Sequence, residues 1–110
     1  MHNPAKHFYE FGPFRVDTQK HRLLRNGEIV PLSSKALETL IVFLQHPNQT
    51  LEREALMQAV WADTFVEDAN LTVAVSQLRK VLGKYGVAGE YIETVPRAGY
   101  RFVAARYASQ

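Results

Sequence analysis

The chain has 110 residues, enough for a single domain with a modest core, and its 46% hydrophobic and 22% charged content is typical of a soluble globular protein. It has no cysteine, which excludes a disulfide framework and a cysteine-based metal site, and no apolar run approaches the roughly 18 residues that span a bilayer. The start, MHNPAKHFYE, lacks the apolar core of a signal peptide, so we expect a cytoplasmic location.

The net charge of +2 is unevenly distributed along the chain. Residues 1–69 hold seven Lys or Arg against nine Asp or Glu, a balance of −2. Residues 70–110 hold six against two, a balance of +4. A basic excess confined to one part of a domain favours a polyanionic partner.

The N-terminal part has the signals of short antiparallel strands. Residues 1–7 show no periodicity and are expected to be a disordered lead. Gly12-Pro13 is a turn dipeptide, and Asn26-Gly27 is the strongest short hairpin signal because both residues tolerate a positive φ. We therefore predict three or four strands, within residues 8–11, 14–17, 22–25 and 28–31.

Two helices follow the strands. Ser33 or Ser34 is expected to cap the first, which runs to about His46 with a broad apolar face. After a short extended link at residues 50–51, the second covers Arg53 to Val60 or Trp61. Arg53 lies in its first turn, where a cation opposes the helix dipole, and this makes it a candidate phosphate contact.

The connection of residues 61–67, WADTFVE, is longer than the turn of a simple helix-turn-helix. It carries two aromatic residues. We expect Phe65 to lie in the core. Trp61 has two interpretations: it fills the core as well, or its indole N–H contacts a phosphate.

Residues 68–82, DANLTVAVSQLRKVL, have the pattern of an amphipathic helix. Asp68 is a plausible N-cap, and Gly83 is placed to end the helix. The apolar positions repeat at helical spacing; they are Leu71, Ala74, Val75, Leu78, Val81 and Leu82.

The opposite face of this helix is unusual for a solvent-exposed surface because it lacks the usual Glu and Lys pairs. Val73, Ser76, Gln77 and Lys80 share it, with Thr72 and Arg79 at its flanks. Such side chains can hydrogen-bond base edges, touch a thymine methyl group and neutralise phosphates. The alternative is that Thr, Ser and Gln are neutral surface residues.

A β-hairpin is predicted near the C-terminus, after a loop at residues 84–89. Its strands are expected at 91–95 and 100–104, and the turn between them carries Arg97. The return strand begins with Tyr100-Arg101, and residues 105–110 are expected to be a frayed tail. A helix with a basic C-terminal end followed by a hairpin is the order of a winged helix, an α+β helix-turn-helix fold.

At this point the chain strongly resembles the OmpR/PhoB-type output domain of bacterial transcription regulators. The residues that carry the resemblance are the Asn26-Gly27 hairpin, LEREALMQAVW from 51 to 61, VEDANLTVAVSQLRKVL from 66 to 82, and ETVPRAGYRF from 93 to 102. The resemblance covers about residues 8–104. It implies a four-stranded N-terminal antiparallel sheet, three helices and a C-terminal hairpin wing.

The resemblance also implies a function in two-component signal transduction or related regulation: the third helix lies in the major groove of double-stranded DNA, and the wing reaches the minor groove. Such proteins bind direct repeats as head-to-tail pairs, and the loop at 61–67 resembles one that contacts RNA polymerase. Related regulators couple the module to a receiver domain or to a membrane-spanning segment, neither of which lies within this stretch. By position, the implied base contacts are Thr72, Val73 and Gln77, the backbone contacts are Arg53, Trp61, Ser76, Arg79 and Thr94, and the role of the wing arginine falls near Arg97. We add Lys80, from the exposed face of the helix, to the backbone contacts, and Arg101, from the return strand, to the wing contacts.

The sequence departs from the better-known pattern of this family at several positions. Ser76 and Gln77 stand where cations or His are frequent, and Pro96 occupies the usual position of the wing arginine, with Arg97 one residue later. Fewer cations predict a shallower dependence of binding on salt. Gln77 favours adenine through a bidentate contact to N6 and N7.

Two other classes of function are weaker alternatives. A winged domain that contacts another protein would explain the modest charge and the exposed Val73. An enzyme is disfavoured because the four His residues lack metal-ligand spacing and a neighbouring nucleophile, and because no Gly-rich phosphate loop is present. The acidic residues of the 61–68 region are interpreted as caps and solvated charges. We expect no cofactor and no membrane contact.

Overall fold

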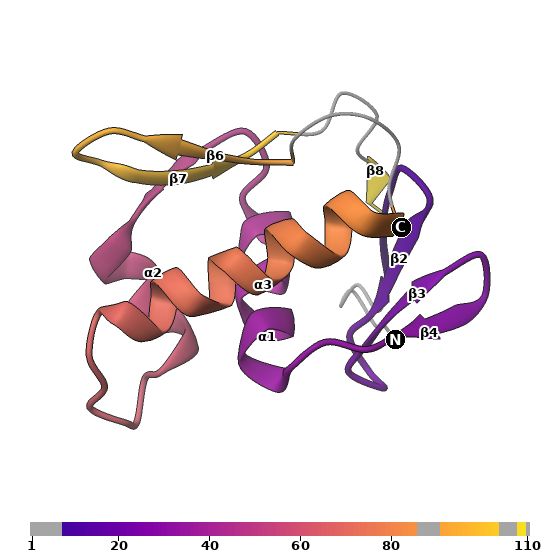
Figure 1. The fold of residues 1–110 in the computed structure, drawn as a ribbon, viewed down its shortest axis with the longest axis horizontal. Coiled ribbons are helices and arrows are strands. Elements are labelled where there is room, and N and C mark those ends of the chain that lie inside the picture. Colours follow the sequence, from indigo (N-terminus) through magenta and orange to yellow (C-terminus); the bar gives the residue numbers. More distant parts are fainter. Residues whose placement is uncertain (1–7, 86–90, 104–107, 110) are drawn as a thin grey trace, which may run out of the picture.

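The computed structural model describes residues 8–85, 91–103 and 108–109 (Figure 1). Its strands are β1 Phe8–Phe11, β2 Phe14–Asp17, β3 Arg22–Arg25, β4 Glu28–Val30, β5 Thr50–Glu52, β6 Ile92–Val95, β7 Gly99–Phe102 and β8 Ala108–Ser109. Its helices are α1 Ser34–Gln45, α2 Arg53–Val60 and α3 Ala69–Tyr85. Within the described residues, no helix combines the length and apolar character needed to cross a membrane.

The N-terminal strands form an antiparallel sheet in the order β4-β3-β2-β1-β8. Asn26 and Gly27 have φ values of 53° and 86°, as the predicted tight hairpin requires. The four predicted strands are confirmed. The expected frayed tail is wrong for residues 108–109, which pair with Tyr9 and Glu10 because the outer edge of β1 offers backbone groups for a further strand. Residues 1–7, the predicted disordered lead, and the rest of the tail lie outside the described residues.

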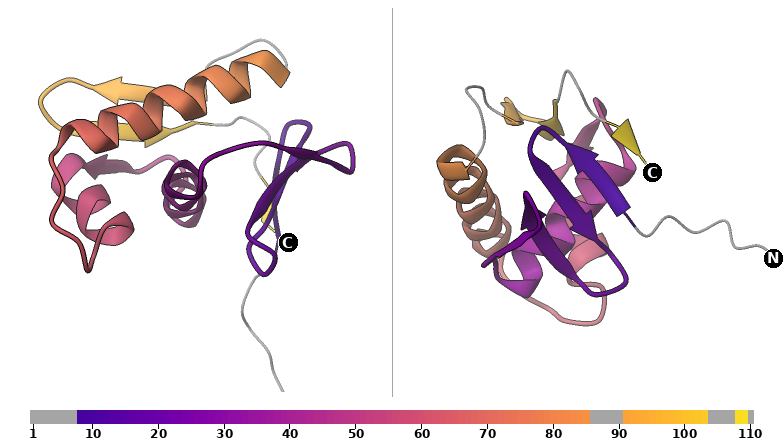
Figure 2. Two further views of the ribbon diagram at one scale, coloured as in Figure 1. Left: turned by 60° about the horizontal axis from the view of Figure 1, so that its bottom comes forward. Right: turned by 90° about the vertical axis from the view of Figure 1, so that its right-hand side faces the viewer.

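Helix α1 lies between the N-terminal sheet and α2, and α3 packs across it (Figure 2). Ser33 is its N-cap, since the Ser33 side chain accepts a hydrogen bond of 3.2 Å from the backbone N–H of Ala36. This resolves the choice between the two serines. The buried side chains of α1 include Leu40 and Phe43, both 0% exposed.

A second sheet has the order β5-β7-β6 and contains the predicted hairpin. The short link at residues 50–51 is thus part of a strand that pairs with β7. Gly99 makes this pairing possible, because a Cβ at that position would overlap the carbonyl oxygen of Leu51. The hairpin turn carries Arg97 in the left-handed region, with a φ of 66°.

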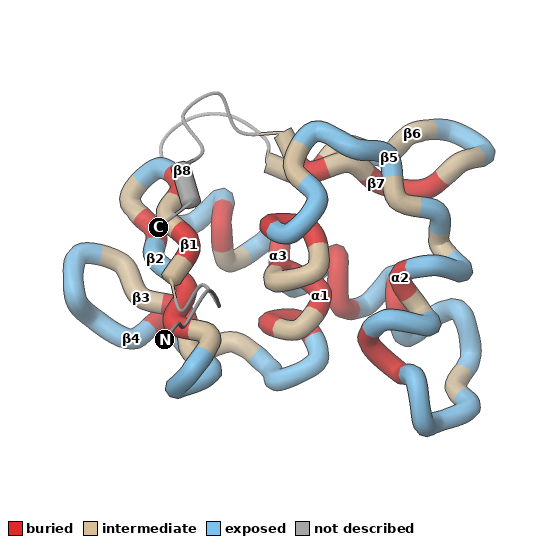
Figure 3. The backbone as a smooth tube through the Cα atoms, turned by 180° about the vertical axis from the view of Figure 1, so that it is seen from behind, coloured by how far each residue is buried: buried red, intermediate tan, exposed pale blue. Residues whose placement is uncertain are grey.

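Two further expectations from the sequence are wrong. Phe65 is 98% exposed and is not part of the hydrophobic core. The connection between α2 and α3 that carries it runs outside the helices (Figure 3). Gly83 does not end α3, which continues through Lys84 to Tyr85. A glycine inside a helix costs about 1 kcal/mol relative to alanine, an amount that neighbouring turns can offset. Residues 86–89 of the expected loop lie outside the described residues.

Candidate nucleic-acid interface

The amphipathic pattern predicted for the third helix is confirmed in α3. Leu71, Leu78 and Leu82 are buried, with exposures of 0–1%. The predicted polar face is exposed, and its most apolar member, Val73, keeps 58% of its surface accessible. Residues 69–85 contain no Asp or Glu, so this face carries only neutral and basic side chains. Its exposed members are Thr72, Val73, Ser76, Gln77 and Lys80.

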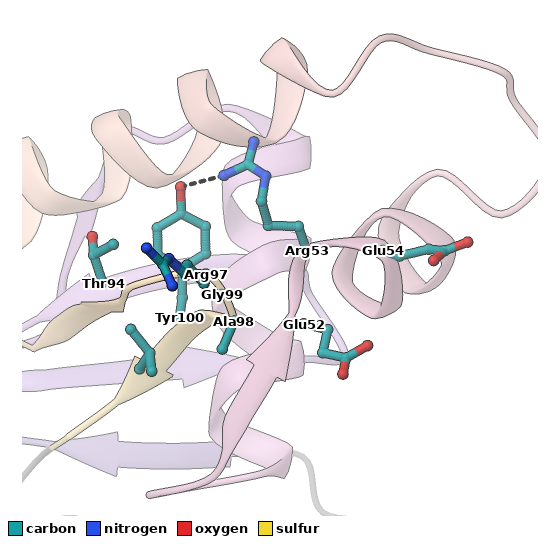
Figure 4. A pocket seen from close by; sticks show the side chains of 9 residues that line it. Glu52, Arg53, Glu54, Thr94, Arg97, Ala98, Gly99 and Tyr100 are labelled. Atoms are coloured by element: carbon teal, nitrogen blue, oxygen red, sulfur yellow. Dashed lines mark hydrogen bonds between the residues drawn. The ribbon is translucent and has the colours of Figure 1, made fainter.

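Arg53 connects the start of α2 to both α3 and the hairpin. Its Nε donates to Asp68 Oδ2 at 2.9 Å, one terminal nitrogen donates to the Tyr100 hydroxyl at 2.8 Å, and the other to Thr72 Oγ1 at 2.9 Å. The bond to Tyr100 is visible in Figure 4. The hydrogen bond to Asp68 is the main reason why the pKa of Arg53 lies above its ordinary value. Arg53 was predicted as a phosphate contact, and its first role in the structure is to hold the N-terminal end of α3.

Arg79 joins a later turn of α3 to the hairpin. It donates to the backbone oxygen of Ile92 at 2.9 Å and to Thr94 Oγ1 at 2.8 Å, both on β6. Its guanidinium carbon lies 5.7 Å from the centre of the Tyr100 ring, and that of Arg53 lies 5.6 Å from the same ring. Two arginines therefore flank one buried tyrosine at cation–π distance, and together they fix α3 against the hairpin.

A cleft of about 510 Å³ lies between the start of α2 and the hairpin (Figure 4). Arg53, Thr94, Arg97 and Tyr100 contribute to its lining, together with the acidic Glu52 and Glu54. Arg97 is exposed at the tip of the hairpin turn. By contrast, Arg101 on β7 forms an ion pair with Glu93 of β6 at 2.7 Å, which leaves it less suited than Arg97 to meet an anion.

Gln77 has a partner that the sequence did not reveal. The hydroxyl of Ser33 donates to Oε1 of Gln77 across 2.7 Å. The two residues line a shallow cleft between the end of the N-terminal sheet and the middle of α3, which also includes Lys80 and Val81. The 44 positions that separate them explain why periodicity could not find this contact.

Trp61 follows α2 and is 9% exposed, as part of the hydrophobic core. The ammonium of Lys35 lies 5.8 Å from the centre of its ring and donates to the backbone oxygen of Val60 at 2.9 Å. Of the two interpretations of Trp61, the structure favours the core position. This burial leaves little of the side chain to contact a phosphate.

The structure brings the predicted residues into two groups. Thr72, Val73, Ser76, Gln77 and Lys80 share one face of α3, whereas Arg53, Arg79 and Thr94 gather around Tyr100 where α3 meets the hairpin. Among the residues that the structure describes, no three His, Asp or Glu side chains are placed to hold a metal ion.

Comparison with known proteins supports this organisation. The sequence model of a family described as "Transcriptional regulatory protein, C terminal" matches residues 27–102. The chain is 37% identical over 79 residues to the cholera toxin transcriptional activator of Vibrio cholerae, which covers 70% of this chain and 27% of that protein. It is 31% identical over 93 residues to the transcriptional activator CadC of Escherichia coli, covering 84% of this chain and 18% of that protein. The chain thus spans only a minor part of the length of these relatives.

Solved structures show the same arrangement. The DNA-binding domain of E. coli CadC superposes with a TM-score of 0.83 at 27% identity, covering 96% of this chain and all of that domain. The RstA DNA-binding domain of Klebsiella pneumoniae, solved in complex with the RstA box, has a TM-score of 0.73 at 30% identity and covers 87% of this chain and 96% of that domain.

Proposed function

The chain belongs to the family of transcriptional regulatory C-terminal domains of the OmpR/PhoB type and has their winged-helix fold. We therefore propose that it binds double-stranded DNA sequence-specifically to regulate transcription. In this proposal α3 enters the major groove and the β6–β7 hairpin is the wing that reaches the adjacent minor groove. Catalysis and cofactors have no part in it, and a cytoplasmic location follows from the need to reach bacterial DNA.

The observation that carries the proposal is the exposed face of α3. The major groove is roughly 12 Å wide and admits one helix, whose side chains then meet base edges. Thr72 and Gln77 offer hydrogen bonds, and the exposed methyl groups of Val73 suit contact with a thymine methyl. With no acidic residue between positions 69 and 85, nothing on α3 itself repels the phosphates on either side of the groove.

Contacts to the DNA backbone would position this helix. Ser76 and Lys80 lie on the same exposed face, and Arg97 extends from the wing tip. Arg53, Arg79 and Thr94 are already bonded within the domain, so we propose that they meet phosphates as parts of a rigid, preorganised cluster. Trp61 and Arg101 remain backbone or wing candidates of lower rank because one is buried and the other is ion-paired.

The connection between α2 and α3 supports a protein partner. Phe65 is 98% exposed, and aromatic residues are enriched in protein–protein interfaces. We propose that residues 61–67 contact RNA polymerase while α3 holds the DNA, and that two copies occupy direct repeats head to tail.

The same loop favours a second candidate function, in which the winged domain serves only to bind another protein. A binding selection from a pool of random duplex DNA at near-physiological salt distinguishes the two. Enrichment of a defined motif, repeated at about one helical turn, supports sequence-specific binding in tandem. Recovery of DNA without a motif would leave only electrostatic binding, and recovery of no DNA would favour the protein-binding function.

A further inference from the structure

The hydrogen bond between Ser33 and Gln77 joins the N-cap of α1 to the middle of the proposed recognition helix. The Ser33 oxygen accepts from the backbone N–H of Ala36 at 3.2 Å, which caps α1. Its hydroxyl proton is therefore available to donate. The acceptor is Oε1 of Gln77 at 2.7 Å, a normal distance for such a bond.

This contact decides which half of the Gln77 amide is left for a base. An amide has one acceptor oxygen and an NH₂ group with two donor hydrogens. With Oε1 held by Ser33, the NH₂ group is the half that is left to meet the groove. The bidentate reading of adenine needs both halves, because Oε1 must accept from N6 while Nε2 donates to N7.

Thr72 shows the same restriction on the same helix. Its Oγ1 accepts from Arg53 at 2.9 Å, which turns the hydroxyl proton away from Arg53 and keeps it available to donate. Both polar base-reading candidates of α3 thus have their acceptor oxygen engaged by a donor of this chain. These two side chains therefore offer donors, and the base whose major-groove edge has two acceptors and no donor is guanine.

We propose that Ser33 is a positioning residue for base recognition, which holds Oε1 of Gln77 so that this side chain selects guanine in place of adenine. The inference rests on the proposed function, since it requires α3 to lie in the major groove. Adenine is disfavoured because its N6 hydrogens would meet the NH₂ group of Gln77 and find no acceptor.

The test is a selection from random duplex DNA with the wild type and four variants. Gln77→Ala identifies the base pair that Gln77 reads, as the one whose preference disappears. At that pair we expect the wild type to prefer guanine over adenine by about tenfold. Ser33→Thr keeps both the cap and the hydroxyl donor, so it should retain the guanine preference.

Two donor-free variants complete the set. Ser33→Asp still caps α1 but has no proton to donate, and its carboxylate accepts from Nε2, so the outward half of the amide becomes the oxygen. We expect its preference at this pair to move from guanine to cytosine or adenine, whose N4 and N6 are donors. Ser33→Gly is uncharged and nearly as good a cap, and should reduce the guanine preference to less than about threefold. Circular dichroism and thermal unfolding check that each variant is folded.

The outcomes separate this inference from the proposed function. A wild type that enriches no motif would contradict both. Two results would overturn the role of Ser33 and leave sequence-specific DNA binding intact. One is a motif in which the base pair read by Gln77 prefers adenine. The other is a guanine preference that both Ser33→Asp and Ser33→Gly retain in full. The role of Ser33 is likewise overturned if Gln77→Ala keeps the base preference of the wild type at every position of the motif.

Discussion

Replacement of Arg53 by Met removes every hydrogen bond of the guanidinium and keeps most of the apolar stem. The structure gives the expected magnitude in three parts. The ion pair with Asp68 has side-chain exposures of 34% and 64%, so solvent screening limits it to about 0.5–1 kcal/mol. The bond to the hydroxyl of the buried Tyr100 contributes about 1 kcal/mol, and the exposed bond to Thr72 about 0.5 kcal/mol.

The variant should therefore lose about 2 kcal/mol of unfolding free energy, which for a domain of this size lowers the Tm by about 8 °C. Urea denaturation measures the loss, and a double-mutant cycle with Asp68→Asn should give a coupling of about 0.5–1 kcal/mol. Tyr100→Phe is the matched control, since it removes only the bond to the tyrosine hydroxyl and should lose about 1 kcal/mol. A loss below 0.5 kcal/mol in Arg53→Met, roughly the size of an ordinary surface substitution, would refute the view that Arg53 fixes α3.

Other predictions concern glycine, tyrosine and the wing. Gly83→Ala should stabilise the domain by about 0.5–1 kcal/mol, because the position is helical and has open space around it. Gly99→Ala should destabilise the domain by more than about 2 kcal/mol, because the added Cβ would overlap the backbone of β5. Thermal unfolding measures both changes. Burial raises the pKa of Tyr91 above its ordinary value near 10, so its contribution to stability is present below pH 10 and is lost as the pH rises through the higher folded value. Tyr91→Phe should reduce the loss of stability above about pH 10, and an unchanged alkaline profile would contradict this assignment. Arg97→Ala should weaken binding to all duplexes alike and reduce the slope of log K against log salt by about one; a loss confined to one sequence would argue for base reading by the wing instead.

Local patterns predicted most of the fold. The Asn26-Gly27 turn specified its hairpin because both residues must adopt a positive φ, and they do. The face of α3 that would be buried followed from the spacing of Leu71, Leu78 and Leu82. These features depend on residues a few positions apart, which is the range over which a sequence pattern carries direct geometric information.

What the sequence did not predict depends on contacts between distant segments. The bond from Arg53 to Tyr100 joins residues 47 positions apart, and no periodicity indicates that their side chains meet. Hydrophobic character alone placed Phe65 in the core, but the core was complete without it and the connection passes outside. The pairing of β5 with β7 was also missed, because a three-residue strand has too short a pattern to identify a distant partner.

The central claim, that α3 and the wing form the DNA-binding surface, is tested most directly by an NMR titration of the isotope-labelled protein with the duplex recovered from the selection. The account predicts that the largest shifts arise in the exposed face of α3, including the side-chain NH₂ of Gln77, and at Arg97 in the wing turn. Shifts confined to residues 61–67, or to the N-terminal sheet, with α3 unchanged would contradict it.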